Sequence, residues 1–294
     1  MNKPYDDYEQ FESGLRRVLW ELREYLNDIV VIGGWVPHLY RKYGGFDSWR
    51  SSLSRTGEVD ILLTSALDTL GRRPLATILA DAGFKPEGDR DRAAVWLGNA
   101  EQGEQIELFV PHVGVAGQIG SQRPIEMQER LAAISLPDLE LLSSFTSELR
   151  IRVTVARQPA TDLGIRIPLL GAYLTNKAST FPKRSTGGTQ VPGSSKRSKD
   201  LLYIRDLAAA GAEVTQRMGR DCLEMRSSSE LVAGRIDRAA SNIRLLLMGS
   251  FSAALHEAAD MLAERDGLGT SEALAELKGY LADAREVLRS SPSA

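Results

Sequence analysis

The sequence predicts an α+β protein: a mixed β-sheet flanked by helices within residues 1–165, followed by a C-terminal helical bundle within residues 166–294. Two observations support this prediction. Short β-branched runs typical of strands occur only before residue 168, between apolar rows that have helical spacing. Beyond residue 168 only the helical rows continue, which is typical of a bundle. The length of 294 residues also suits two domains of ordinary size.

Strand and helix patterns alternate along the first half. Strands are expected at residues 28–32, 58–63, 92–97, 105–110, 150–155 and 165–167. Helices are expected at residues 11–26, 35–42, 67–82 and 137–145. Gly33 and Gly34 end the first strand in a tight turn, because glycine permits backbone conformations that other residues avoid. Pro37 falls in the first turn of the helix that follows, where its missing N–H is tolerated.

The second half is expected to contain helices at residues 169–180, 199–210, 229–248, 251–265 and 272–288. Between the first two of these helices, residues 181–198 form a polar loop rich in glycine, proline and serine. It contains no acidic residue, and with Lys199 directly after it the basic residues are Lys183, Arg184, Lys196 and Arg197. Two interpretations stay open: a mobile arm that binds the backbone of an RNA, or a solvated loop.

Composition excludes several classes of protein. The formal net charge of −3 excludes a uniformly basic nucleic-acid coat, although a local basic patch remains compatible. The single cysteine, Cys222, cannot form an internal disulfide. The three histidines are far apart, so we expect no zinc site, and a metal would be a hard cation held by carboxylates. With no secretory signal and no long apolar run, we expect a cytoplasmic protein that does not bind membranes.

Three acidic residues interrupt apolar strands. Glu58 and Asp60 are two positions apart, so their side chains share one face of a strand. Two adjacent carboxylates repel unless a cation or a proton neutralises them, and the alternative is an exposed strand face on which both are simply solvated. Glu107 interrupts a second apolar strand, where the alternative is an edge strand with an outward side chain. Together the three acids could hold two Mg²⁺ ions, one acid also accepting the proton of an attacking hydroxyl.

With these acids, the glycine turn Gly33-Gly34-Trp35 resembles the nucleotidyltransferase superfamily, which has the polymerase-beta-like fold. A downstream pattern looks like the tail of the AbiEii-like nucleotidyltransferases, a family that includes toxins of toxin–antitoxin pairs. That pattern consists of Gly171-Ala172-Tyr173, Lys177, Lys199-Asp200-Leu201-Leu202-Tyr203 and Asp206-Leu207. The resemblance covers about residues 28–210.

The resemblance implies a role for each matching residue. Gly33 and Gly34 would line the triphosphate of an NTP. Glu58, Asp60 and Glu107 would bind Mg²⁺ or Mn²⁺. Lys177 would contact the triphosphate or the incoming substrate, and Asp200 would orient that lysine.

Further residues and partners follow. Arg55 and Thr56, just before the carboxylate strand, could reach a phosphate or only cap a loop, and Lys199 is another candidate for nucleotide binding. The acceptor hydroxyl would belong to an RNA, such as the 3′ end of a tRNA. A cognate antitoxin protein would be a partner.

Two departures from the family pattern keep other functions open. Glutamate stands at positions 58 and 107 where aspartate is usual, and Mg²⁺ requires strict octahedral geometry. The 23 residues between Gly34 and Glu58 also exceed the usual spacing. The alternatives are a catalytically degenerate nucleotidyltransferase fold that binds a partner, and an enzyme that modifies a protein or a small molecule.

Overall fold

In the computed structural model the chain divides into two compact units. The first contains Met1–Leu39 and Arg55–Pro168, and the second contains Tyr40–Ser54 and Leu169–Ala294. The structure describes residues 7–46, 49, 51–54, 57–64, 67, 71–88, 92–98, 104–112, 120–126, 128–154, 159–183 and 196–290. The α+β fold class is confirmed, with a mixed sheet and a helical C-terminal region. The division differs from the expected domains because residues 40–54 are part of the second unit.

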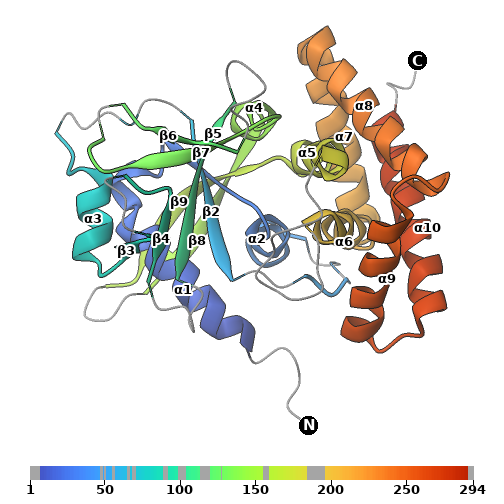
Figure 1. Ribbon diagram of the computed structural model, residues 1–294, viewed down its shortest axis with the longest axis horizontal. Helices are drawn as coiled ribbons and strands as arrows, with labels where there is room; N and C mark the ends of the chain where they lie inside the picture. Colours follow the sequence, from blue (N-terminus) through green and yellow to red (C-terminus); the bar gives the residue numbers. More distant parts are fainter. Residues whose placement is uncertain are drawn as a thin grey trace. The chain divides into compact units, whose positions relative to one another are not determined.

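The first unit is built on a mixed seven-stranded sheet (Figure 1). Its strands are β1 (Ile29–Ile32), β2 (Glu58–Leu63), β3 (Lys85–Pro86), β4 (Val95–Leu97), β5 (Gln105–Pro111), β6 (Gln122–Pro124) and β7 (Ala132–Leu136). The neighbours follow the order β1-β2-β5-β4-β3, while β7 pairs with β5 and β6. β2 and β7 run parallel to β5, and the remaining pairs are antiparallel. β5 is therefore a central strand.

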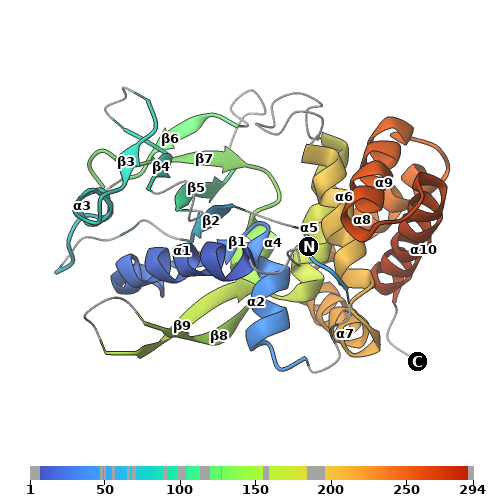
Figure 2. The ribbon, with the colours of Figure 1, turned by 90° about the horizontal axis from the view of Figure 1, so that it is seen from below.

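Helices and a two-stranded ribbon complete this unit. They are α1 (Asp7–Glu21), the 3-10 helix η1 (Arg23–Tyr25), α3 (Leu75–Asp81), α4 (Glu140–Ser144) and the antiparallel pair β8 (Thr146–Val153) and β9 (Thr161–Pro168). Helix α2 (Trp35–Tyr43) starts in this unit and ends in the second. In Figure 2, α1 lies between the sheet and the ribbon of β8 and β9. Its apolar residues Leu15, Val18 and Leu19, with Leu22 directly after it, are accordingly buried almost completely.

The second unit is helical in its described parts. Its elements are α5 (Leu170–Thr180), the 3-10 helix η4 (Phe181–Lys183), α6 (Lys196–Ala208), α7 (Ala212–Ser228), α8 (Glu230–Leu247), α9 (Ser252–Asp266) and α10 (Thr270–Arg289). Every residue of α5 is buried, because α6, α7 and α8 all pack against it. None of the described helices has the length and apolar sequence that crossing a membrane requires.

Several expected elements differ from the observed ones. The helix expected at residues 67–82 is described only as α3, because Pro74 immediately precedes its first residue and Gly71 has a φ of 76°. α4 is shorter than expected, whereas β8 and β9 are longer because they pair over their whole length. The sequence patterns missed β3, β6, β7 and α7 altogether. α7 was missed because polar and charged residues interrupt its apolar row.

Candidate functional site

The carboxylates Glu58, Asp60 and Glu107 project from one face of the two adjacent strands β2 and β5. In this parallel pair Asp60 is the partner of Glu107, and Glu58 is the partner of Gln105. Alternate residues of a strand share a face, so these four side chains lie on the same side. The intervening residues of both strands are buried on the other side. The alternative that placed Glu107 on an edge strand is wrong, because β5 has neighbours on both edges.

Gly33 makes room for the side chain of Asp60. β1 pairs antiparallel with β2, and its last residue, Ile32, is the partner of Asp60. Gly33 follows with a φ of 70°, and a Cβ atom on it would lie 1.7 Å from Oδ2 of Asp60. Any other residue would therefore collide with this carboxylate. The structure thus brings together one residue of the predicted phosphate turn and one residue of the predicted metal set.

The donor chemistry of this face fits a hard cation, although the acids are not gathered around one point. Among the residues that the structure describes, no group of three or more His, Cys, Asp or Glu side chains could hold a metal ion. Gln105 donates a 3.0 Å hydrogen bond from Nε2 to Oε1 of Glu107. Carboxylate oxygens are the donors that Mg²⁺ and Mn²⁺ prefer, but Gly33 leaves room for the Asp60 side chain itself and not for an ion beside it.

Lys177 and Asp200 form a buried ion pair in the second unit. Nζ of Lys177 on α5 donates a 2.9 Å hydrogen bond to Oδ1 of Asp200 on α6. Only 8% of the lysine side chain and 3% of the aspartate side chain are exposed. A buried charge is costly unless it is paired, so each residue needs the other. The family resemblance implied this partnership, and the structure places the two side chains in direct contact.

Of the other predicted nucleotide-binding residues, the structure describes Lys199 and Gly34. Lys199 lies in the first turns of α6 and is half-buried. Gly34, after Gly33 in the turn, is buried directly before α2. Arg55 and Thr56 lie outside the described residues.

The expected basic loop is shorter than residues 181–198, because α6 begins at Lys196. Arg197 donates a 3.1 Å hydrogen bond to the carbonyl oxygen of Pro182, and its guanidinium lies 5.4 Å from the ring centroid of Phe251. Lys183 belongs to the 3-10 helix η4. Arg197 is therefore part of a helix, so neither interpretation of the loop, the mobile arm or the solvated loop, applies to this residue. Arg184 lies outside the part of the chain that the structure describes.

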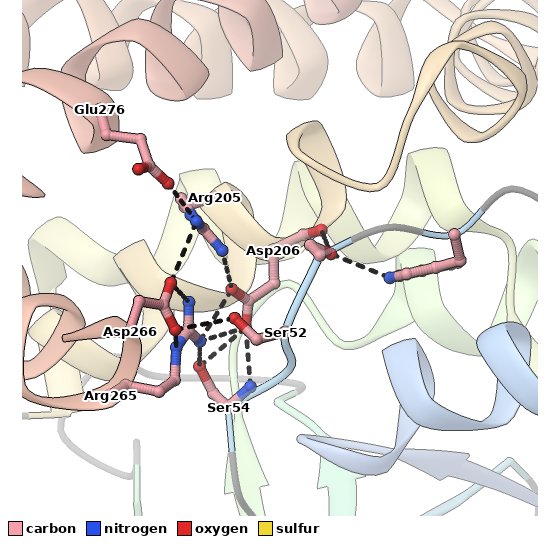
Figure 3. A network of polar contacts seen from close by, with 9 residues as sticks. Ser52, Ser54, Arg205, Asp206, Arg265, Asp266 and Glu276 are labelled. Carbon is pink, nitrogen blue, oxygen red and sulfur yellow. Dashed lines mark hydrogen bonds and ion pairs between the residues drawn. The ribbon is translucent and has the colours of Figure 1, made fainter. Parts of the chain in front are cut away.

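Sequence reasoning missed a polar network around Asp206, which is fully buried on α6 (Figure 3). One of its oxygens, Oδ2, accepts hydrogen bonds of 2.8 Å from the backbone N–H and from the hydroxyl of Ser54. Arg265 on α9 donates to both carboxylate oxygens at 3.0 and 3.2 Å. Arg205 also donates to Asp206 and bonds to Glu276 on α10. The network therefore attaches the segment that contains Ser54 to the helices of the second unit.

Burial raises the pKa of Asp206 above its ordinary value, although the charge of Arg265 and the hydrogen bonds from Ser54 act in the opposite direction. Burial also acts to raise the pKa of Asp266, but the hydrogen bond and charge of Arg265 outweigh this effect and leave the pKa below its ordinary value. Asp206 belongs to the motif that carries the family resemblance. No local pattern indicated its partners, since Ser54 lies 152 positions away.

Gly171, from the same resemblance, has a packing role. A Cβ atom on it would lie 2.7 Å from Cβ of Asp221 and 3.0 Å from backbone atoms of α7. Its N–H also donates a 3.1 Å hydrogen bond to Oδ2 of Asp221. This glycine therefore lets α5 and α7 approach each other closely.

In comparisons with known proteins, no family model, no curated protein and no solved structure matches this chain. Its function must therefore be inferred from the geometry described above and from the resemblance of the motifs.

Proposed function

We propose that the protein is a metal-dependent nucleotidyltransferase. It would transfer a nucleoside monophosphate from an NTP to a hydroxyl group and release pyrophosphate. The observation that carries this proposal is the placement of Glu58, Asp60 and Glu107 on one face of adjacent strands, with Gly33 against Asp60. A glycine turn beside a carboxylate face offers backbone N–H groups and acidic oxygens to the same ligand.

Each residue of this face would have a distinct task. Glu58, Asp60 and Glu107 would hold Mg²⁺ or Mn²⁺, which when bound supplies charge neutralisation at the phosphates. Glu107 would also accept the proton of the acceptor hydroxyl. Gly33 and Gly34 would donate backbone hydrogen bonds to phosphate oxygens, together with the first turn of α2, which begins at the next residue.

Lys177 would stabilise the negative charge of the triphosphate. Its ion pair with Asp200 supports this role because the pair fixes the position of a long and flexible side chain. Lys199, Arg55 and Thr56 remain further candidates for nucleotide binding.

The acceptor that we propose is RNA, such as the 3′ end of a tRNA. Lys183, Arg184 and Lys196 are the residues to test for RNA binding, because Arg197 is engaged in packing. Neutralising these three residues should weaken RNA labelling and reduce its salt dependence by about one unit of slope for each phosphate interaction removed. NTP binding should remain. Unchanged labelling and salt dependence would direct the search to a protein or small-molecule acceptor.

As a toxin of a toxin–antitoxin pair, the protein would act in the cytoplasm and would be neutralised by a cognate antitoxin. Expression of the wild type without a partner should then slow bacterial growth. Expression of the Asp60→Asn variant to the same level should not. Equal growth with both proteins would contradict the toxin assignment while leaving the transferase activity open.

One experiment separates an active transferase from a degenerate binding fold. The purified protein is incubated with each NTP, labelled at the α-phosphate, together with Mg²⁺ or Mn²⁺ and total cellular RNA. Nucleotide binding is measured in parallel by equilibrium dialysis. Label in RNA supports the proposal, and label in protein changes only the acceptor. Binding of an NTP without transfer to any acceptor would favour the degenerate fold.

A further inference from the structure

We propose that Tyr203 and Tyr173 are positioning residues for Lys177. Together with Asp200 they form a box that holds the lysine ammonium at one point. The inference rests on the proposed function, in which Lys177 acts on the triphosphate. It adds two residues to which the family resemblance assigned no role.

Helical spacing explains why the two tyrosines meet the Lys177–Asp200 ion pair. Tyr173 lies four positions before Lys177 on α5, and Tyr203 lies three positions after Asp200 on α6. Residues three or four positions apart share a helix face, so each helix contributes one tyrosine and one charged residue to the same contact. The two rings lie edge to face, with centroids 6.4 Å apart.

Both rings lie within range of a cation–π interaction with the ammonium. Nζ of Lys177 lies 5.0 Å from the ring centroid of Tyr203 and 5.4 Å from that of Tyr173. The negative face of an aromatic ring attracts a cation, and the attraction is stronger where water is excluded. The surroundings are buried, since Tyr173 is 0% exposed and Tyr203 is 8% exposed. The ammonium is therefore held by one charged hydrogen bond and two rings.

The rings restrict a motion that Asp200 alone would allow. A lysine side chain has a flexible four-carbon stem, and one hydrogen bond to Asp200 leaves several rotamers available. Contacts with two rings remove most of them. A lysine in one position is prepared to meet a phosphate without first losing this freedom, which is how a preorganised group aids binding or transfer.

The alternative is that the tyrosines only fill the core. Two substitutions separate the roles. Tyr203→Phe keeps the ring and its attraction for a cation, whereas Tyr203→Leu keeps an apolar side chain without it. Tyr280→Leu is the matched control, because it removes another cation–π contact of the second unit, with Arg205 at 5.3 Å from the ring centroid.

The direct measurement is the rate at which an acylating reagent labels Lys177 in the folded protein, followed by mass spectrometry. Exposed Lys278 on α10 is the internal reference. We expect labelling of Lys177 to become about two- to thirty-fold faster in Tyr203→Leu, as expected when a cation–π interaction is removed. Tyr203→Phe and Tyr280→Leu should label at the wild-type rate. Equal labelling of Lys177 in wild type and in folded Tyr203→Leu would overturn the proposal.

A variant of unchanged ring shape covers the case in which Tyr203→Leu does not fold. A phenylalanine with three ring fluorines at position 203 preserves packing but removes the negative ring face. Faster labelling of Lys177 than in Tyr203→Phe supports the positioning role, and an equal rate overturns it.

Transfer kinetics then connect the box to activity. The KM for NTP should rise or kcat should fall in Tyr203→Leu, and Tyr203→Phe should restore both values. If labelling changes as expected but Lys177→Ala transfers nucleotides normally, the role of Lys177 in the proposed function fails and the box stands. If labelling is unchanged while Lys177→Ala is inactive, the box fails and the proposed function stands.

Discussion

Oδ2 of Asp60 lies 1.7 Å from the point that a Cβ atom on Gly33 would occupy. This relationship couples the glycine turn to the carboxylate face, because any side chain at position 33 would collide with Asp60. In Gly33→Ala we expect Asp60 to be displaced, the free energy of unfolding to fall and nucleotide binding to be lost. The free energy is measured by urea unfolding.

Gly71→Ala is the matched control for this prediction. Gly33 and Gly71 have φ values of 70° and 76°, but a Cβ atom on Gly71 meets nothing within 4 Å. Alanine at either position bears the strain of a left-handed backbone, about 1–2 kcal/mol. Gly33→Ala should lose clearly more stability than Gly71→Ala, because only the first also collides with a carboxylate. Equal losses would show that Asp60 adapts freely.

Gly171→Ala should lower the free energy of unfolding by about 1–3 kcal/mol, because the added methyl group meets the backbone of α7. Gly219→Ala on α7 should instead raise the free energy of unfolding. Nothing lies within 4 Å of its Cβ position, and alanine favours a helix interior by up to about 1 kcal/mol. Urea unfolding of both variants tests the difference. A Gly171→Ala variant as stable as the wild type would contradict the close approach of α5 and α7.

Asp206 should make stability depend on pH in a recognisable direction. Its pKa in the native protein lies above the ordinary value of 3.8, so the native state binds the proton more tightly than the unfolded state. The free energy of unfolding that Asp206 contributes therefore falls as the pH rises from 3.8 through the native pKa. Asp206→Asn cannot titrate. The free energy of unfolding of the wild type minus that of Asp206→Asn should accordingly decrease as the pH rises over this window.

Urea unfolding of both proteins from about pH 4 to about pH 8 measures this difference. Titration of other groups, Asp266 among them, largely cancels because both proteins contain them. A difference that stays constant would mean that Asp206 does not titrate in this range. A difference that grows with pH would mean that Arg265 and Ser54 outweigh burial.

Cys222 should resist alkylation in the native protein. Its side chain is fully buried on α7, and burial, followed by the charge of Asp221, raises the pKa of the thiol to about 12. The reactive thiolate is therefore scarce at neutral pH. Mass spectrometry after treatment with iodoacetamide should detect labelling only as urea unfolds the second unit. Complete labelling of the native protein within minutes would contradict the burial of this thiol.

The parts of the fold that follow local patterns could be predicted from the sequence. β2 and β5 appear as apolar runs interrupted by acids, and the rows of α8, α9 and α10 have clear helical spacing. The position of β5 in the sheet could not be predicted, because it depends on pairing with β2, β4 and β7 over long separations. A local pattern contains no information on such partners.

The candidate site shows the same limit. Asp60 could be recognised as an acid that interrupts an apolar strand, and Lys177 as part of the pattern that resembles the family. The Lys177–Asp200 pair follows from the same resemblance. The long interval between Gly34 and Glu58 stood out only as a departure from the family pattern. Part of it is the segment in which Ser51 and Ser54 hydrogen-bond to Asp206. Neither serine has a local feature that indicates a distant aspartate as its partner.

The position of the transferred label tests the central claim most directly. The wild type is incubated with the preferred NTP, labelled either at the α-phosphate or at the γ-phosphate, with Mg²⁺ and RNA. The account predicts that α-label enters RNA, that γ-label appears only in pyrophosphate, and that Asp60→Asn lowers transfer by about a hundredfold or more. Asp162→Asn, at an exposed position on β9, should transfer at the wild-type rate. Transfer of γ-label, or full activity of Asp60→Asn, would contradict nucleotidyl transfer at the carboxylate face.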